Sequence, residues 1–109
     1  MGDSSLGEFE QTILLAILGS GDSAFALEVR RKIEEETGRR VSRGAFYTTL
    51  ERLERKGLVI WTKVQPATAR RREAHRLFSV TPAGLEMLRS TQEHLKARWA
   101  RLAEVLEKS

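Results

Sequence analysis

The most regular feature of this chain is an apolar repeat close to its C-terminus. Apolar residues recur there in alternating steps of three and four, the spacing of a helix that packs along one seam. Thr81-Pro82 supplies a helix start, with threonine as the N-cap and proline as the first helical residue. We therefore predict a helix from about Pro82 to Leu106, roughly 37 Å long at the usual rise per residue. Its seam consists of Leu85, Leu88, Gln92, Leu95, Trp99, Leu102 and Leu106.

A helix this long carries more apolar surface than a small three-helix core can cover. The first predicted helix, over residues 6–18, is also apolar on nearly all sides, which is typical of a helix covered from more than one direction. We therefore predict a homodimer in which the long helix pairs with a second copy, assisted by Leu6 and Phe9 of the first helix. In the alternative interpretation, the long helix packs back on its own domain.

The rest of the chain predicts three helices followed by a β-hairpin. Serines at positions 5, 23 and 42 are candidate N-caps, and glycines follow each apolar-periodic segment. Two β-leaning runs then flank a basic segment that contains Pro66, the pattern of a hairpin with a longer loop. The expected elements are helices over about 6–18, 24–37 and 42–56 and strands over 58–64 and 77–80.

This order of elements predicts a mainly α fold, a winged helix-turn-helix with a small β-hairpin. The second and third helices form the helix-turn-helix, and the hairpin is the wing. We expect a winged helix-turn-helix domain over residues 1–81 and a dimerisation helix over residues 82–109. The length of 109 residues suits one such core.

Composition narrows the function. The net charge is +4, and the arginines gather in the middle of the chain, which favours a polyanionic partner such as double-stranded DNA. There is no cysteine, and His75 and His94 stand isolated from other metal-binding or catalytic residue types. No phosphate loop or nucleophile elbow occurs. We therefore predict that the chain is not an enzyme and has no cofactor and no metal.

The sequence predicts neither a membrane-spanning segment nor a signal peptide. The longest apolar run, residues 13–18, is far shorter than the roughly 20 residues of a membrane span. Residues 1–5 show no basic segment followed by an apolar one, so no signal peptide is predicted. The expectation is a cytoplasmic protein with no membrane partner.

Four stretches of the sequence resemble the PadR-type transcriptional regulators, named for phenolic acid decarboxylase control. They are LGEFE with ILLAIL (6–10 and 13–18), VSRGAFYTTL (41–50), RLERKGLV (52–59) and RLFSVTPAG (76–84). The resemblance covers residues 6–90 and fits the short form with a single C-terminal helix. Leu77 stands where the family usually has an aromatic residue, and Thr48-Thr49 where it often has proline or a small residue. The resemblance implies a DNA-binding regulator, usually a repressor.

The third helix is the predicted recognition helix, which must present polar groups on its outer N-terminal face to enter the major groove. Arg43 would reach a guanine edge, Tyr47 a phosphate, and Gly44 would let the backbone come close. Arginines at the wing tip would reach phosphates or a narrow minor groove. A solvated amphipathic helix is the alternative. The predicted DNA-binding residues are Ser42, Arg43, Gly44, Tyr47, Thr48, Arg52, Arg70, Arg71 and Arg72.

Two interpretations stay open at Trp99, which lies on the seam itself. It packs between two copies of the long helix, or it stacks on a small aromatic effector, as in some relatives. For the whole chain, the favoured function is a dimeric repressor on a pseudo-palindromic promoter site. The alternative is a winged-helix module that binds another protein, in which the arginines only keep it soluble.

Overall fold

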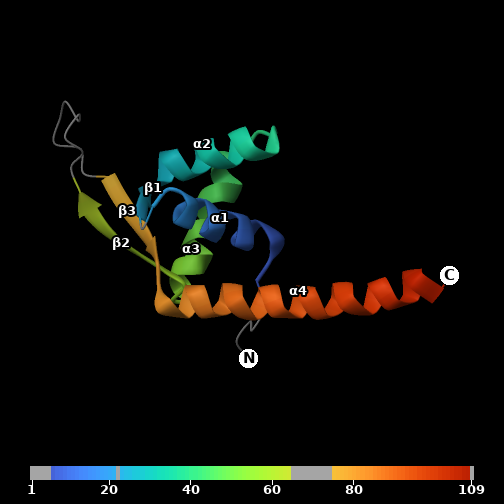
Figure 1. Cartoon of the computed structure of the whole chain (residues 1–109). Helices are drawn as coiled ribbons and strands as arrows, with labels where there is room; N and C mark the ends of the chain where they lie inside the picture. Colours follow the sequence, from blue (N-terminus) through green and yellow to red (C-terminus); the bar gives the residue numbers. More distant parts are fainter. Residues whose placement is uncertain (1–5, 22, 65–74, 109) are drawn as a thin grey trace.

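The computed structural model describes residues 6–21, 23–64 and 75–108. In this part of the chain, helices and strands follow one another in the predicted order, with one strand more than expected (Figure 1). The mainly α fold class with a small β-sheet is confirmed. The elements are α1 (Glu8–Gly19), β1 (Ser23–Phe25), α2 (Ala26–Thr37), α3 (Arg43–Arg55), β2 (Val59–Val64), β3 (His75–Val80) and α4 (Pro82–Lys108).

Helix α1 begins two residues later than the sequence predicted. Its N-cap is Gly7, whose backbone N–H donates to a Glu10 carboxylate oxygen at 2.7 Å. The predicted cap, Ser5, lies outside the described residues. Leu6 precedes the helix and is buried in the core of its own chain, at 9% exposure.

The predicted start of the second helix at Ala24, with Ser23 as its cap, is wrong. Ser23–Phe25 is a strand that pairs antiparallel with β3, where Ala24 lies opposite Phe78. The predicted hairpin is therefore part of a three-stranded sheet of order β1-β3-β2. Helix α2 starts after Phe25, whose backbone N–H donates to the Glu28 carboxylate at 2.8 Å. The backbone groups of this segment are satisfied by pairing with β3 instead of by a further helical turn.

The turn between α2 and α3 is fixed by side chains of α2. Glu34 accepts a hydrogen bond from the backbone N–H of Val41 at 2.8 Å, and Arg30 Nε donates to the Val41 carbonyl at 3.2 Å. Ser42 then caps α3 as predicted, since its hydroxyl oxygen accepts from the N–H of Ala45 at 3.3 Å. These bonds set the angle at which α3 leaves the turn.

We call α1, α2, α3 and the sheet the body. Its apolar core lies among these elements, and the inner face of α3 contributes side chains that are almost completely buried. The largest fully buried side chains are Phe46, Ile13, Leu14, Ile17, Leu53, Val29 and Val59.

The start of α4 is locked to the body. As predicted, Thr81 caps the helix, because its Oγ1 accepts from the N–H of Gly84 at 3.0 Å; the same hydroxyl donates to the Gly57 carbonyl at 2.7 Å. Gly84 packs so closely that a Cβ on it would overlap the Leu58 carbonyl oxygen and lie 2.7 Å from Val80 Cγ1. Glycine is therefore required where α4 meets the sheet.

The rest of α4 projects beyond the body (Figure 1). Every residue from Gln92 to Lys108, which we call the α4 tail, is exposed. The molecule measures 63 × 33 × 24 Å, and its radius of gyration is 16.6 Å. A compact chain of this length would have a radius of about 13 Å. The tail accounts for this elongation.

Candidate nucleic-acid interface

Helix α3 has one buried face and one exposed polar face. Phe46 and Leu53 are completely buried against the core. On the other side, Arg43, Tyr47 and Arg52 face solvent. The described residues that the sequence assigned to DNA contact are all exposed on this helix: Ser42, Arg43, Gly44, Tyr47, Thr48 and Arg52. The predicted wing residues Arg70, Arg71 and Arg72 lie outside the described residues.

Two of these side chains are held together at the start of α3. The Arg43 guanidinium lies over the Tyr47 ring, 5.7 Å from its centroid. The Tyr47 ring in turn contacts the buried Phe46 edge-on, with centroids 5.3 Å apart. Such contacts limit the conformations open to both exposed side chains before any ligand binds.

Gly44 is a different case from Gly84. The nearest atom to a Cβ added at Gly44 would be Ser42 Oγ, at 3.9 Å, so the packing of the protein does not require glycine here. Its predicted role, close backbone approach to DNA, stays a prediction. The hydroxyl oxygen of Ser42 is already engaged by the N–H of Ala45, so its first role in the free protein is to cap α3.

The wing side of the site carries an arginine that the sequence analysis did not assign. Arg76 on β3 lies over the Trp61 ring of β2, 4.4 Å from its centroid. The Trp61 indole N–H donates to the carboxylate of Glu54 on α3. Because Trp61 stands opposite Phe78 in the strand register, this chain of contacts depends on the pairing of β2 with β3. No pattern along the sequence could have revealed it.

A hollow of about 580 Å³ separates the start of α3 from the wing. Arg43 and Tyr47 line it from α3, and Arg30 lines it from α2. The remaining lining comes from β1, the start of α2 and β3, namely Phe25, Ala26, Leu27, His75, Arg76 and Phe78. Arg30 and His75, like Arg76, were not among the predicted site residues.

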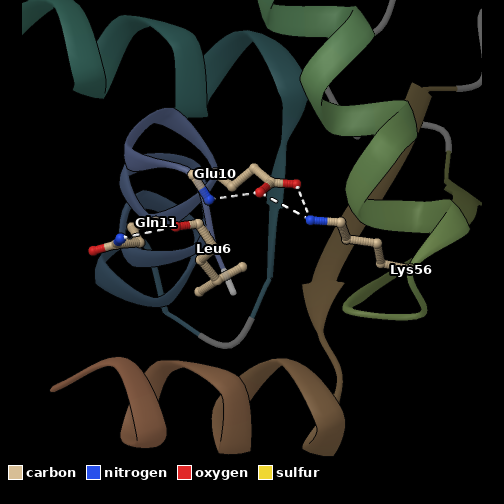
Figure 2. Close-up of polar contacts among 5 residues, drawn as sticks. Leu6, Glu10, Gln11 and Lys56 are labelled. Atoms are coloured by element: carbon tan, nitrogen blue, oxygen red, sulfur yellow. Dashed lines mark hydrogen bonds and ion pairs between the residues drawn. The ribbon is translucent and has the colours of Figure 1, made fainter. Parts of the chain in front are cut away.

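The other end of α3 is tied to α1 by an ion pair (Figure 2). Lys56 Nζ lies 2.9 and 3.0 Å from the two carboxylate oxygens of Glu10, whose side chain is only 5% exposed. Burial alone would raise the pKa of Glu10. The hydrogen bond from Gly7 and the charges of Lys56 and Arg52 outweigh burial and hold the pKa of this carboxyl below its ordinary value. The carboxylate therefore stays charged and anchors the end of the candidate recognition helix.

The structure divides the predicted dimerisation residues into two sets. Leu6 is buried in the core, and Phe9 and Leu88 pack partly against it, so these three serve their own chain. The other set is exposed along α4, with Trp99 at 59%. Val105, which the sequence analysis left out, is exposed at 61%. The exposed set is Leu85, Gln92, Leu95, Trp99, Leu102 and Leu106.

The described part of the chain lacks two further features. No three histidine, cysteine, aspartate or glutamate side chains there are grouped so that they could hold a metal ion. None of the described helices combines the length and apolar character needed to cross a membrane.

Comparison with known proteins supports the fold. The model of the transcriptional regulator PadR-like family matches residues 14–90. No curated protein matches the chain in sequence.

Solved structures match almost the whole chain. A PadR-like regulator from Bacillus cereus is 21% identical, with a TM-score of 0.71 over 90% of each chain. A PadR-like transcription factor from Bacteroides fragilis is 23% identical, with a TM-score of 0.65 over 91% of this chain and 86% of the other. RosR from H. salinarum is 22% identical, with a TM-score of 0.66 over 94% and 92%. At these identities, the likeness establishes a shared fold.

Proposed function

The chain belongs to the PadR-like family of transcriptional regulators, and on that premise we propose that it is a homodimeric repressor that binds a pseudo-palindromic site in double-stranded DNA. It would act in the cytoplasm, where promoter DNA is accessible. The observation that carries the proposal is the exposed polar face of α3. Arg43, Tyr47 and Arg52 stand on it, while its opposite face anchors the helix in the core.

The geometry of α3 suits the major groove. Its start is capped by Ser42, and the positive end of the helix dipole favours a nearby phosphate. Arg43 and Tyr47 follow within the first turns, where recognition helices contact base edges and phosphates. Because Tyr47 fixes Arg43 by stacking, less side-chain freedom is lost when DNA binds.

The α4 tail supports the dimer. A single helix in water that exposes a row of large apolar side chains is poorly stable unless another surface covers them. A second copy of the tail offers the same row and would cover it symmetrically. A two-fold dimer of this kind would place the two α3 helices in successive major grooves, about 34 Å apart.

Selection of binding sites from random DNA tests the proposal directly. Purified protein, assayed at two salt concentrations, should enrich a sequence with two related half-sites and bind it more weakly at the higher salt. Arg43→Ala and Tyr47→Ala should each weaken binding to that sequence without unfolding the protein. The matched control is Lys32→Ala, which removes one positive charge beside Gly19 at the end of α1.

The outcomes separate the candidate functions. The protein-binding module would be supported instead if no DNA sequence is enriched and the protein binds a partner protein with an affinity that does not change with salt. Equal affinity of the wild type, Arg43→Ala and Tyr47→Ala would show that α3 is not the recognition helix.

Trp99 carries a second candidate function, the binding of a small planar aromatic effector. Its exposed indole lies with Leu95, Arg98 and Leu102 along one side of a hollow on α4. A flat aromatic molecule could stack on such a surface. Quenching of the protein's fluorescence by planar aromatic compounds, lost in Trp99→Leu but kept in Trp61→Phe, would support it. Absence of quenching would assign Trp99 to packing between the two tails.

A further inference from the structure

The hollow between α3 and the wing, which we call the arginine cleft, gathers three positive side chains. Arg30 comes from α2, Arg43 from α3 and Arg76 from β3, so three separate elements converge on it. As far as the structure describes its lining, the cleft contains no aspartate or glutamate. Three like charges close together raise the energy of the folded protein unless an anion offsets them.

These arginines are held by uncharged groups. Arg43 stacks on Tyr47, Arg76 stacks on Trp61, and Arg30 donates to the backbone carbonyl of Val41. Within the described residues, the ion pairs formed by arginine and lysine are Lys56–Glu10 and Arg89–Glu86, and neither involves the cleft. The three guanidinium groups are therefore held in place, and none of them forms an ion pair with a described residue, so they can bind an anion.

Negative charge lies beside the cleft at one end of its α3 lining. Glu51 and Glu54, one to two turns further along α3, line a neighbouring hollow that shares Arg76 and Tyr47 with the cleft. Glu54 accepts the indole N–H of Trp61, and the Trp61 ring lies under Arg76. The negative charges would repel a polyanion on their side. They leave the side of Arg30 and Arg43, at the start of α3, as the favourable path.

We infer that the arginine cleft holds the sugar-phosphate backbone of one DNA strand between the recognition helix and the wing. Arg30 and Arg76 contact phosphates there, and Trp61 is the positioning residue of Arg76. The inference rests on the proposed function, since the cleft shares Arg43 and Tyr47 with the proposed recognition surface. A strand that borders a major groove occupied by α3 would pass beside Arg43 and Tyr47, which also line this cleft.

The salt dependence of DNA binding tests the two phosphate contacts. With DNA of the selected sequence, Arg76→Ala and Arg30→Ala should each weaken binding about fivefold, to a similar extent on unrelated DNA. Each should also reduce the slope of log affinity against log salt by about 0.9. Lys32→Ala makes the same change in net charge outside the cleft and should leave the slope unaltered.

A double-mutant cycle tests the positioning role of Trp61. Trp61→Ala keeps every arginine but should weaken binding about threefold, and Trp61→Phe should restore most of the loss because it keeps a ring under Arg76. Added to Arg76→Ala, Trp61→Ala should have no further effect on affinity or slope. A purely structural role of Trp61 would instead weaken binding in both backgrounds. Circular dichroism of each variant verifies that it is folded.

Specific outcomes would overturn the inference. If the wild type binds DNA and Arg76→Ala and Arg30→Ala keep its salt slope, the cleft is not a phosphate contact, while the proposed function stands. If inorganic phosphate binds the wild type and not Arg76→Ala, yet both bind DNA equally, the cleft is a site for a small anion. If the wild type binds no DNA, both the inference and the proposed function fail.

Discussion

The body and the α4 tail use the same kind of apolar spacing, with opposite results. In the body, Phe46 and Leu53 on α3 are completely buried by neighbouring elements. In the tail, Leu95 and Leu102 are 49% and 43% exposed, although they repeat with equal regularity. The apolar face of α3 is covered within one chain, and the apolar row of the tail is not. Periodicity therefore predicts that a helix face will be covered but does not identify the molecule that covers it.

The strongest test of this contrast is to make the tail polar. Leu95→Asp combined with Leu102→Asp should raise the dissociation constant of the proposed dimer by about a thousandfold. The dimer would lose four leucines, two from each copy. Each is about half exposed in the single chain, so its burial on pairing is worth roughly 1 kcal/mol, and each 1.4 kcal/mol is a factor of about ten. Analytical ultracentrifugation over a concentration series would measure the change.

The thermal transition of the body should remain cooperative in the same double variant. Glu93→Asp, on the same tail, is the control and should leave the dimer intact. If the wild type is monomeric at all concentrations, the proposed dimer is contradicted. The tail would then need no second copy, and it would not differ from the body in requiring a partner.

Gly84→Val tests the junction between the two regions. The added side chain would overlap the Leu58 carbonyl oxygen and Val80, so α4 must shift away from the sheet. We expect a loss of about 3 kcal/mol in the free energy of unfolding, measured by urea denaturation. Ala83→Val places the same side chain one residue earlier, on an exposed face, and should cost a few tenths of that. Equal stability of the two variants would contradict the close contact at Gly84.

Glu10→Gln tests the ion pair that stabilises the body. The substitution keeps the acceptor for the Gly7 N–H but removes the charge that faces Lys56, so we expect a loss of about 2 kcal/mol at pH 7. Because the folded pKa of Glu10 lies below the ordinary 4.5, the stabilisation is complete above that value.

The contribution of Glu10 should be lost as the pH falls through the folded pKa, so the wild type and Glu10→Gln should converge in acid. Urea denaturation at pH 7 and at several values below 4.5 would follow the convergence. Glu8→Gln, two residues away and exposed, is the control. A stability difference for Glu10→Gln that is independent of pH would contradict the ion pair.

Ser42→Ala is the mildest change in the body. Loss of the bond from the Ala45 N–H should cost about 1 kcal/mol. Ser42→Asp restores a capping acceptor and should recover the stability, while its negative charge weakens DNA binding. Thermal denaturation and DNA-binding assays on both variants would separate the two roles. Equal DNA affinity for Ser42→Asp and the wild type would place Ser42 away from the phosphates.

The sequence predicted those parts of the structure that depend on local signals. Ser42 was identified as the cap of α3 and Thr81 as the cap of α4 because both signals lie within one helical turn. The buried and exposed faces of α3 followed from its apolar spacing alone. The PadR-type resemblance was confirmed by the family match over residues 14–90.

The features that the sequence did not predict depend on distant partners. Strand β1 has only three residues, and it forms because the edge of β3, more than fifty residues later, pairs with it. The stacking of Arg76 on Trp61 needs the register of two strands, and the Glu10–Lys56 pair joins residues 46 positions apart. The length of the last helix was predicted closely, whereas the burial of Leu6 in its own chain was not.

The close contact of Gly84 with Leu58 joins α4 to the body, so the two are expected to move together. A flexible joint there would let the far end of the helix move without affecting the DNA-binding surface. With the joint closed by backbone packing, a tilt of the tail turns the whole body with it. Over a helix about 40 Å long, a tilt of about 5° displaces one end by about 3.5 Å, close to one base-pair step. In the proposed dimer, a small rearrangement between the two tails would therefore move the two α3 helices in or out of register with the proposed half-sites.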